Sequence, residues 1–371
     1  MIYITSLFYL FYFSIIGIYI IFLPKVLADI GYNALEIGII FSAAPLVRFL
    51  IPLLFIRGFK LGNQSFYTAL VILFFSVILF YFSLYDFYML LVSNILFGIG
   101  LSLVLPYVEL ISLQEVGKER YGKSRLFGSL GFMGTALILV KHLSSADVAL
   151  NYLLILTFAT VLFAFLVVKN TSSKEEETKS HTHHLSVLKD YKLWVGFIFM
   201  QIGFGAFYNF YTIYETSYGI SMDMTVYLWS FGVIIEIIML YFQGGLLQKN
   251  LLNIIRFTIL ATAIRWLLVF LYPQNLYIMF FAQSIHALSF ALFHSASISF
   301  LFHLYKNKPL AQQMFSGLSY GLGSLLGALI SGYIYQYLPK YLFLSSFFFA
   351  LIAFFSISSF SKTHIQKQYL D

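Results

Sequence analysis

Long apolar runs follow one another along most of this chain, and they limit the possible folds more than any other feature. Each run is about 20 residues long, the length that an α-helix needs to cross a bilayer. Of the 371 residues, 60% are hydrophobic and only 10% are charged, whereas a soluble domain has about 25% charged residues. The sequence therefore predicts an all-α membrane protein with many transmembrane helices.

Twelve apolar segments are long enough to be such helices, and they fall into two groups of six. They predict one six-helix bundle over residues 1–168 and another over residues 191–371, joined by a polar linker over residues 169–190. The predicted helices cover residues 3–24, 34–56, 64–84, 87–112, 123–142, 147–168, 191–215, 222–247, 252–272, 274–303, 309–338 and 340–361.

The positions of the basic residues predict the orientation. Of the 22 Lys and Arg residues, most fall in the loops of one side, together with both chain ends. Cytoplasmic loops carry an excess of Lys and Arg, so both termini are predicted to be cytoplasmic. These loops also account for the net charge of +7 without a nucleic-acid partner. The exceptions are Lys25, Lys141 and Lys340 in the outer loops and Arg48 and Arg265 inside helices.

Metal and thiol chemistry have little support in the sequence. The chain has no cysteine, which excludes disulfides and thiolate-bound metals. The predicted linker contains His181, His183 and His184, a short tract of a kind that can bind metal, but its other residues are typical of a solvated connector. We expect no metal site and no cofactor.

Charged and titratable residues inside the predicted helices are the main functional signal. A charge at the centre of a membrane helix costs roughly 3 kcal/mol, so such residues rarely persist without a role. Arg125 and Glu215 are closer to the helix ends, where they are expected to reach water. The candidates deeper in the membrane are Arg48, Glu109, Glu236, Arg265, His286 and His294.

Three of these candidates, Glu236, Arg265 and His286, lie near the middle of three different helices of the second bundle. At one depth they can form a cluster around a cavity, in which a carboxylate binds and releases a proton as its surroundings change. A Glu–Arg pair that only locks two helices together is the other interpretation. His286 and His294 are eight residues apart, so a regular α-helix places them on one broad face.

A second polar pair is expected in the first bundle. Glu109 ends an apolar run, a charged turn follows, and Arg125 begins the next helix. That helix contains Gly128, Gly131 and Gly134, and small residues let helices approach closely. Polar and aromatic residues of the second bundle are expected either to line the substrate site or to pack in the core. They are Gln201, Tyr208, Asn209 and Trp229.

Several stretches in both halves carry a family pattern. They are LVRFL (46–50), YGKSRLFGSLGF (121–132), YLWSFGVIIEI (227–237), IRW (264–266), QSIHALSFALFH (283–294) and GYIYQYL (332–338). Together they resemble the 3-phenylpropionate permease group, a branch of the major facilitator superfamily related to lactose permease and the nucleoside:proton symporters. RLFGSLGF (125–132) also aligns with QMFSGLSY (313–320), as in a parallel repeat of six helices.

The resemblance implies a twelve-helix proton symporter with the major facilitator fold. Lactose permease pairs a glutamate in a P-x-x-E setting with an arginine that opens the next helix, and Glu109 and Arg125 fit that pattern. It also uses an arginine and a histidine that Arg265 and His286 resemble in order and spacing. Its proton-carrying glutamate lies three residues after the histidine, where this chain has Ser289, so the role passes to Glu236. The superfamily's loop between helices two and three carries an Asp, which RGFKLGN (57–63) lacks.

The sequence thus predicts a secondary transporter of the bacterial inner membrane that imports a small organic solute with protons by alternating access. An aromatic acid such as 3-phenylpropionate is the first candidate. Arg265, Arg125 or Arg48 would bind its carboxylate, and Glu236, Glu109 or His286 would carry the proton. The expected partners are the substrate, protons and lipid, with the proton gradient as energy source and a monomer as the working unit.

Other functions stay open. Within transport they are a sugar or nucleoside symporter and a drug:proton antiporter. A membrane-embedded enzyme working through His286, His294 and Glu236 lacks an HExxH motif in this sequence. A sensor that no longer transports would keep the fold but would not need titratable groups in the middle of the membrane.

Overall fold

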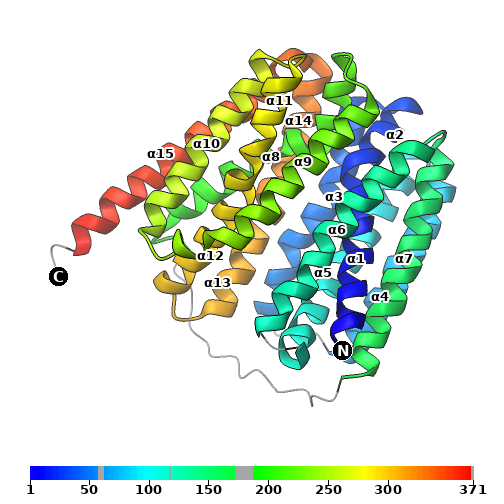
Figure 1. Ribbon diagram of the computed structural model, residues 1–371, viewed down its shortest axis with the longest axis horizontal. Helices are drawn as coiled ribbons and strands as arrows, with labels where there is room; N and C mark the ends of the chain where they lie inside the picture. Colours follow the sequence, from blue (N-terminus) through cyan, green and yellow to red (C-terminus); the bar gives the residue numbers. More distant parts are fainter. Residues whose placement is uncertain (57–61, 117, 172–186, 369–371) are drawn as a thin grey trace. The chain divides into compact units, whose positions relative to one another are not determined.

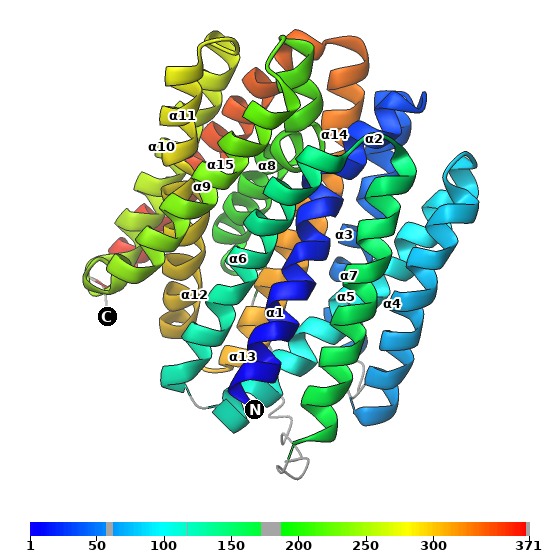
Figure 2. The same cartoon turned by 45° about the vertical axis from the view of Figure 1, so that its right-hand side comes forward.

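The computed structural model describes residues 1–56, 62–116, 118–171 and 187–368, which are helical apart from short connections (Figures 1 and 2). The first elements are α1 (Ile2–Gly17), the π-helix η1 (Ile18–Phe22), α2 (Leu23–Asp29), α3 (Ala34–Ile56), α4 (Asn63–Ser83), α5 (Phe87–Val116), α6 (Lys118–His142) and α7 (Ala146–Lys169). The next are α8 (Tyr191–Ser217), α9 (Met222–Phe242), the 3-10 helix η2 (Gln243–Gly245), α10 (Leu251–Leu271), α11 (Leu276–Ser284) and the π-helix η3 (Ala287–Leu292). The last are α12 (Phe293–Leu304), α13 (Lys308–Phe315), the π-helix η4 (Ser316–Gly323), α14 (Ser324–Tyr337), the 3-10 helix η5 (Pro339–Tyr341) and α15 (Leu342–Gln368).

The described residues contain eleven helical segments that are long and apolar enough to cross a membrane, so the predicted multi-pass architecture is confirmed. The long helix outside this set is α6, whose first turns are rich in Lys, Arg and Gly. A twelfth crossing and the cytoplasmic position of both termini remain predictions. The charged turn predicted between Glu109 and Arg125 is wrong. Because Lys, Glu and Arg are good helix formers, α5 continues to Val116 and α6 already begins at Lys118.

The chain divides into two compact units. The first contains residues 1–179 with residues 221–230, and the second contains residues 180–220 with residues 231–371. The helix α9 thus contributes to both. Residues 57–61 of the predicted loop and residues 172–186 of the predicted linker, with its three histidines, lie outside the described residues. The predicted bundle boundaries stay a prediction.

In the first unit, α1 packs against α6 and α7, and α5 packs against α3 and α4. Buried tyrosines fasten α1 and η1 to α5, since polar groups in an apolar core need partners inside the protein. Tyr12 donates a hydrogen bond to the Leu101 carbonyl at 3.0 Å, and Tyr19 donates one to Asn94 Oδ1 at 2.9 Å. These bonds fix α1 and η1 against α5.

In the second unit, α8 is the central helix and packs against α14, α15 and η4. Gly205 on α8 lies so close to Gly327 on α14 that a Cβ at position 205 would collide with the Gly327 backbone. Hydroxyl groups complete these contacts. Ser319 donates to the Phe197 carbonyl at 3.0 Å, and Ser356 donates to the Lys192 carbonyl at 2.7 Å. This close packing fixes the face of α8 that carries aromatic residues toward α10.

The three glycines predicted to allow close packing of α6 differ in their surroundings. A Cβ on Gly131 would collide with the backbone carbonyl of Leu10 on α1, and one on Gly128 would lie 2.7 Å from the ring of Phe13. At Gly134 there is nothing within 4 Å. The contact between α1 and α6 therefore depends on the first two glycines.

Replacing Gly131 by alanine is expected to destabilise the first unit, whereas Gly134→Ala is the matched control on the same helix. Both substitutions gain the same helix propensity, but only the first forces α1 and α6 apart, and overpacking typically costs about 1–3 kcal/mol. Thermal unfolding of the two variants in detergent is the measurement. Equal melting temperatures would contradict the packing described for Gly131.

Candidate functional site

A buried arginine organises the polar residues of the second unit. Arg265 on α10 is 0% exposed. Its Nη1 lies 3.0 Å from Nδ1 of His286, and its Nη2 donates to Oε1 of Gln283 on α11 at 2.9 Å. Because an arginine has only donors, Nδ1 of His286 must accept the bond. The imidazole is therefore neutral in this arrangement and carries its proton on Nε2.

The other ring nitrogen of His286 faces an acid. Its Nε2 lies 3.7 Å from Oε2 of Glu236 on α9, and the two side chains are 8% and 15% exposed. The polar groups thus form a row from Gln283 through Arg265 and His286 to Glu236. We call these four residues the arginine–histidine row.

Aromatic rings enclose the guanidinium group. Its Cζ lies 4.3 Å from the centre of the Phe207 ring and 4.4 Å from that of Trp266. The imidazole of His286 stacks on Phe290 with ring centres 5.5 Å apart and planes within 6°. Cation–π contacts of this kind stabilise a desolvated cation by about 2 kcal/mol. They do not neutralise its charge.

The charge of Arg265 has no direct counter-ion in the described part of the chain, since its two hydrogen-bond partners are neutral. Its Nε also has no hydrogen-bond partner among the described residues. Leaving an ion unpaired in an apolar interior costs several kcal/mol. The row therefore provides what an anionic group needs: a cation with donors, in surroundings of low polarity.

The prediction that Glu236, Arg265 and His286 lie together is confirmed by their contacts. The Glu–Arg pair considered as the alternative is not formed directly, because the ring of His286 lies between the two. Gln283 was not predicted from the sequence as a member of this group. Its position three residues before His286 was the available signal, since residues at that spacing share a face of a helix.

The pair predicted in the first unit also forms. Arg125 Nε lies 3.4 Å from Glu109 Oε1, and the two side chains are 36% and 29% exposed. The guanidinium lies over the Phe13 ring at 4.0 Å and over the Tyr9 ring at 5.5 Å. These two aromatic residues of α1 were not predicted. This pair is more exposed than the arginine–histidine row, so its attraction is weakened by the solvent.

Three further predicted residues have packing contacts. Gln201 is 1% exposed and lies against Gly323 of η4. Asn209 donates to the Gly205 carbonyl of its own helix at 2.8 Å. Trp229 is buried and contacts an aromatic ring of α6. Of the aromatic candidates, Tyr208 is the one beside the row, because it stacks on Phe204, which lies within 5.9 Å of the Arg265 guanidinium.

His294 and Arg48 lie apart from the row. His294 is exposed, and its Nδ1 lies 2.9 Å from the Tyr320 hydroxyl. The two histidines therefore lie in different surroundings, and their common helix face stays a prediction. The π-helix η3 lies between the two histidines. Arg48 is exposed, and no described residue forms an ion pair with it.

Glu215, which was expected to reach water, is instead 0% exposed near the end of α8. Neither of its carboxyl oxygens has a hydrogen-bond partner among the described residues. Its position in the sequence did not indicate this burial, because a residue near a helix end can still be enclosed by neighbouring segments. Glu215 is thus a second buried acid of the second unit.

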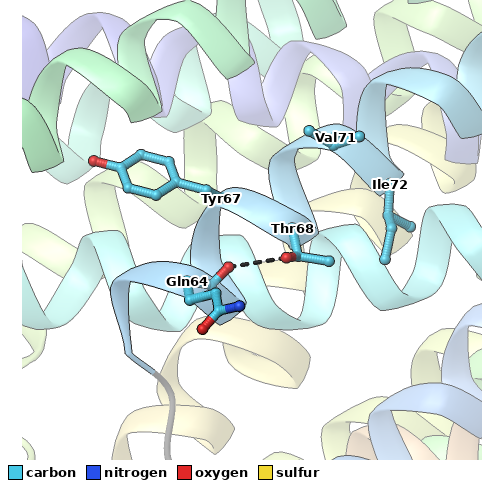
Figure 3. A pocket seen from close by; sticks show the side chains of 5 residues that line it. All are labelled: Gln64, Tyr67, Thr68, Val71 and Ile72. Carbon is cyan, nitrogen blue, oxygen red and sulfur yellow. Dashed lines mark hydrogen bonds between the residues drawn. The ribbon is translucent and has the colours of Figure 1, made fainter.

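A surface hollow of about 590 Å³ lies elsewhere, on α4 (Figure 3). Its wall consists of Gln64, Tyr67, Thr68, Val71 and Ile72. In Figure 3 the hydroxyl of Thr68 donates to the Gln64 carbonyl, at 3.0 Å. These residues carry no charge and belong to one apolar helix, so the hollow is a groove of the helix surface and contains none of the predicted site residues.

Comparisons with known proteins agree with this architecture. The model of the MFS_1 like family matches residues 2–345. A probable 3-phenylpropionic acid transporter of Escherichia coli (strain K12) is 25% identical over 355 residues, which are 89% of this chain and 90% of the relative. The uncharacterized transporter YwbF of Bacillus subtilis (strain 168) is 24% identical over 64% of this chain and 61% of its own length.

Solved structures show the same fold. The crystal structure of the nucleoside transporter NupG superposes with a TM-score of 0.79 at 16% identity, over 97% of this chain and 99% of that one. The POT family transporter PepTSo superposes with a TM-score of 0.75 at 12% identity, over 100% of this chain and 98% of that one. At such identities the likeness concerns the fold alone.

Replacing each of the two arginines, Arg265 and Arg125, by lysine tests how much its surroundings contribute to stability. In Arg265→Lys the shorter point charge cannot serve both Gln283 and His286, and an unsatisfied buried acceptor costs about 1–3 kcal/mol. In the matched Arg125→Lys variant a partly exposed pair is weakened, which costs about 0–1 kcal/mol. We expect a clearly larger fall of the melting temperature for Arg265→Lys. A larger fall for Arg125→Lys would show that the row contributes little to stability.

Proposed function

Since this chain belongs to the MFS_1 like family and is a multi-pass membrane transporter, we propose that it carries a small aromatic acid across the membrane together with protons. The observation that carries this proposal is the arginine–histidine row. It combines a fully buried cation, rings that suit an aromatic group, and an acid at the far end of a neutral histidine.

The row supports recognition of a carboxylate. Arginine binds carboxylates through two parallel hydrogen bonds, and Arg265 directs both Nη groups to neutral acceptors that an anion would outcompete. Phe204, Phe207 and Tyr208 offer ring faces next to that position. The relative in E. coli is described as a probable transporter of 3-phenylpropionic acid, which combines a carboxyl group with a phenyl ring. This agreement makes 3-phenylpropionate the first substrate to test.

Charge balance supports the coupling to protons. A carboxylate that takes over the Arg265 donors releases Nδ1 of His286, which is then free to bind a proton. With Glu236 ionised, its charge balances that of Arg265, so the negative charge of the substrate is left uncompensated in a region of low polarity, which is costly. One proton on His286 or Glu236 offsets it. Binding of the acid and binding of a proton therefore favour each other in this row, as symport requires.

The remaining features of the proposal follow the transporter family and the sequence pattern. We place the protein in the bacterial inner membrane, with twelve crossings and both termini in the cytoplasm. It works as a monomer by alternating access between its two units. The proton gradient supplies the energy, without a cofactor. The more exposed Glu109–Arg125 pair of the first unit is the second place where a substrate group can bind.

Uptake by proteoliposomes tests this proposal. With an inward proton gradient, the wild-type protein is expected to accumulate labelled 3-phenylpropionate, while protein-free liposomes report the acid that crosses lipid unaided. Glu236→Gln is expected to reduce accumulation to that background but to keep exchange of internal for external substrate, because exchange needs no net proton movement. Glu109→Gln is the matched acid-to-amide control in the other unit.

Two results would contradict the proposal in different ways. If the wild type moves a sugar or a nucleoside with protons and ignores the aromatic acid, the substrate class is wrong. If Glu236→Gln still accumulates the acid while Glu109→Gln does not, the proton is carried in the first unit.

A further inference from the structure

We propose that Glu215 is a second proton-binding site of the second unit, separate from Glu236, and that it holds a proton in the conformation seen here. The inference deepens the proposed symport and rests on it for its role in transport. The presence of the proton itself is argued from the burial and the surroundings of the side chain alone.

The described surroundings of Glu215 contain no group that would stabilise an ionised carboxylate. Its side chain is 0% exposed, and neither oxygen has a hydrogen-bond partner among the described residues. No described cation forms an ion pair with it. An isolated ionised carboxylate in an apolar interior is so costly that such a group binds a proton instead. The buried acid is therefore neutral in this conformation.

The end of α8 adds a second argument. Ile220 N–H donates to the Glu215 carbonyl at 3.1 Å, Gly219 N–H donates to the Thr216 carbonyl at 3.1 Å, and Gly219 has a φ of +88°. This is the Schellman motif, in which the two positions held here by Glu215 and Ile220 commonly make an apolar contact. Ile220 is indeed buried, at 8% exposed.

A negative charge at this position would also face the helix dipole. The C-terminal end of a helix carries a partial negative charge and disfavours an anion in its last turn. Both features of the helix end therefore favour the neutral form of Glu215. The turn after α8 is short, and it lies at the end of a predicted membrane segment, where water is close.

The groups around Glu215 connect it with the arginine–histidine row. The titratable groups near Glu215 on α8 are Tyr211 and Tyr214. Two further tyrosines lie near Tyr214: Tyr218, which directly follows α8, and Tyr335 of α14. Tyr211 lies one turn before Glu215 and within electrostatic range of both Glu215 and Arg265. Its ring is 5.0 Å from that of Phe207.

Phe207 in turn lies under the Arg265 guanidinium, so one face of α8 links the two sites. Phe207, Tyr211 and Glu215 follow each other at intervals of four residues, which places them in one stripe along the helix. When the turn after α8 admits water, Glu215 can ionise, and its new negative charge favours the positive charge of the row. Loss of the proton at Glu215 is thereby coupled to the occupancy of the substrate site.

Infrared difference spectroscopy on the reconstituted full-length protein tests for the proton directly. Titrated from acid to alkaline pH, the wild type is expected to lose the C=O stretching band of a protonated, unhydrated carboxylic acid. The same band should be absent from Glu215→Gln and present in Glu236→Gln. Glu36→Gln is the control, because Glu36 is only half-buried and accepts a hydrogen bond from the Asn33 N–H group. A band that Glu215→Gln leaves unchanged, or that never titrates, overturns the proposal.

Proton counting tests the role in transport. In proteoliposomes with an internal pH dye, Glu215→Gln is expected to take up fewer protons per substrate than the wild type while exchanging substrate at a similar rate. An unchanged proton-to-substrate ratio overturns this part of the inference. If the wild type does not move the aromatic acid at all, the proposed function fails, but the infrared band still decides whether Glu215 binds a proton. Equal melting temperatures of the wild type and Glu215→Gln verify that the fold is kept.

Discussion

The hydrocarbon core of a bilayer offers no hydrogen-bond partners, and this constraint governs the whole structure. Backbone groups must be satisfied within the protein, which leaves helices as the natural element for such apolar segments. Charged side chains must be satisfied as well. Arg265 meets that demand with His286, Gln283 and two aromatic faces. Glu215 has no such partners, and a proton is the remaining way to remove its charge.

The two units solve the problem of a membrane charge differently. In the first unit, Arg125 and Glu109 face each other directly and keep about a third of their surface exposed, so water shares in their solvation. In the second unit, Arg265 is fully buried, and the acid Glu236 is separated from it by the neutral imidazole of His286. An exposed pair changes little when a proton binds, whereas a sealed row responds strongly. For that reason our proposal places proton coupling in the second unit.

The sequence predicted the helices well, because runs of apolar residues reflect a requirement of each segment by itself. It also predicted that Glu236, Arg265 and His286 meet, since the cost of isolated charges makes their association the natural outcome. It failed at Glu215, which is buried although it lies close to a helix end, and it did not separate the exposed His294 from the buried His286. The burial of a side chain depends on which other segments cover it, and the local residue pattern does not show this.

What the sequence by itself determined is the class of protein, the helices and the set of polar residues that need an explanation, since these follow from hydropathy along the chain. Only the tertiary structure decided which groups face each other. In the structure, His286 lies between Arg265 and Glu236. Gly128 and Gly131, but not Gly134, contact α1. The carboxyl oxygens of Glu215 have no hydrogen-bond partner among the described residues. The physical reason is that hydrogen bonds and close packing depend on distances between segments far apart in the chain.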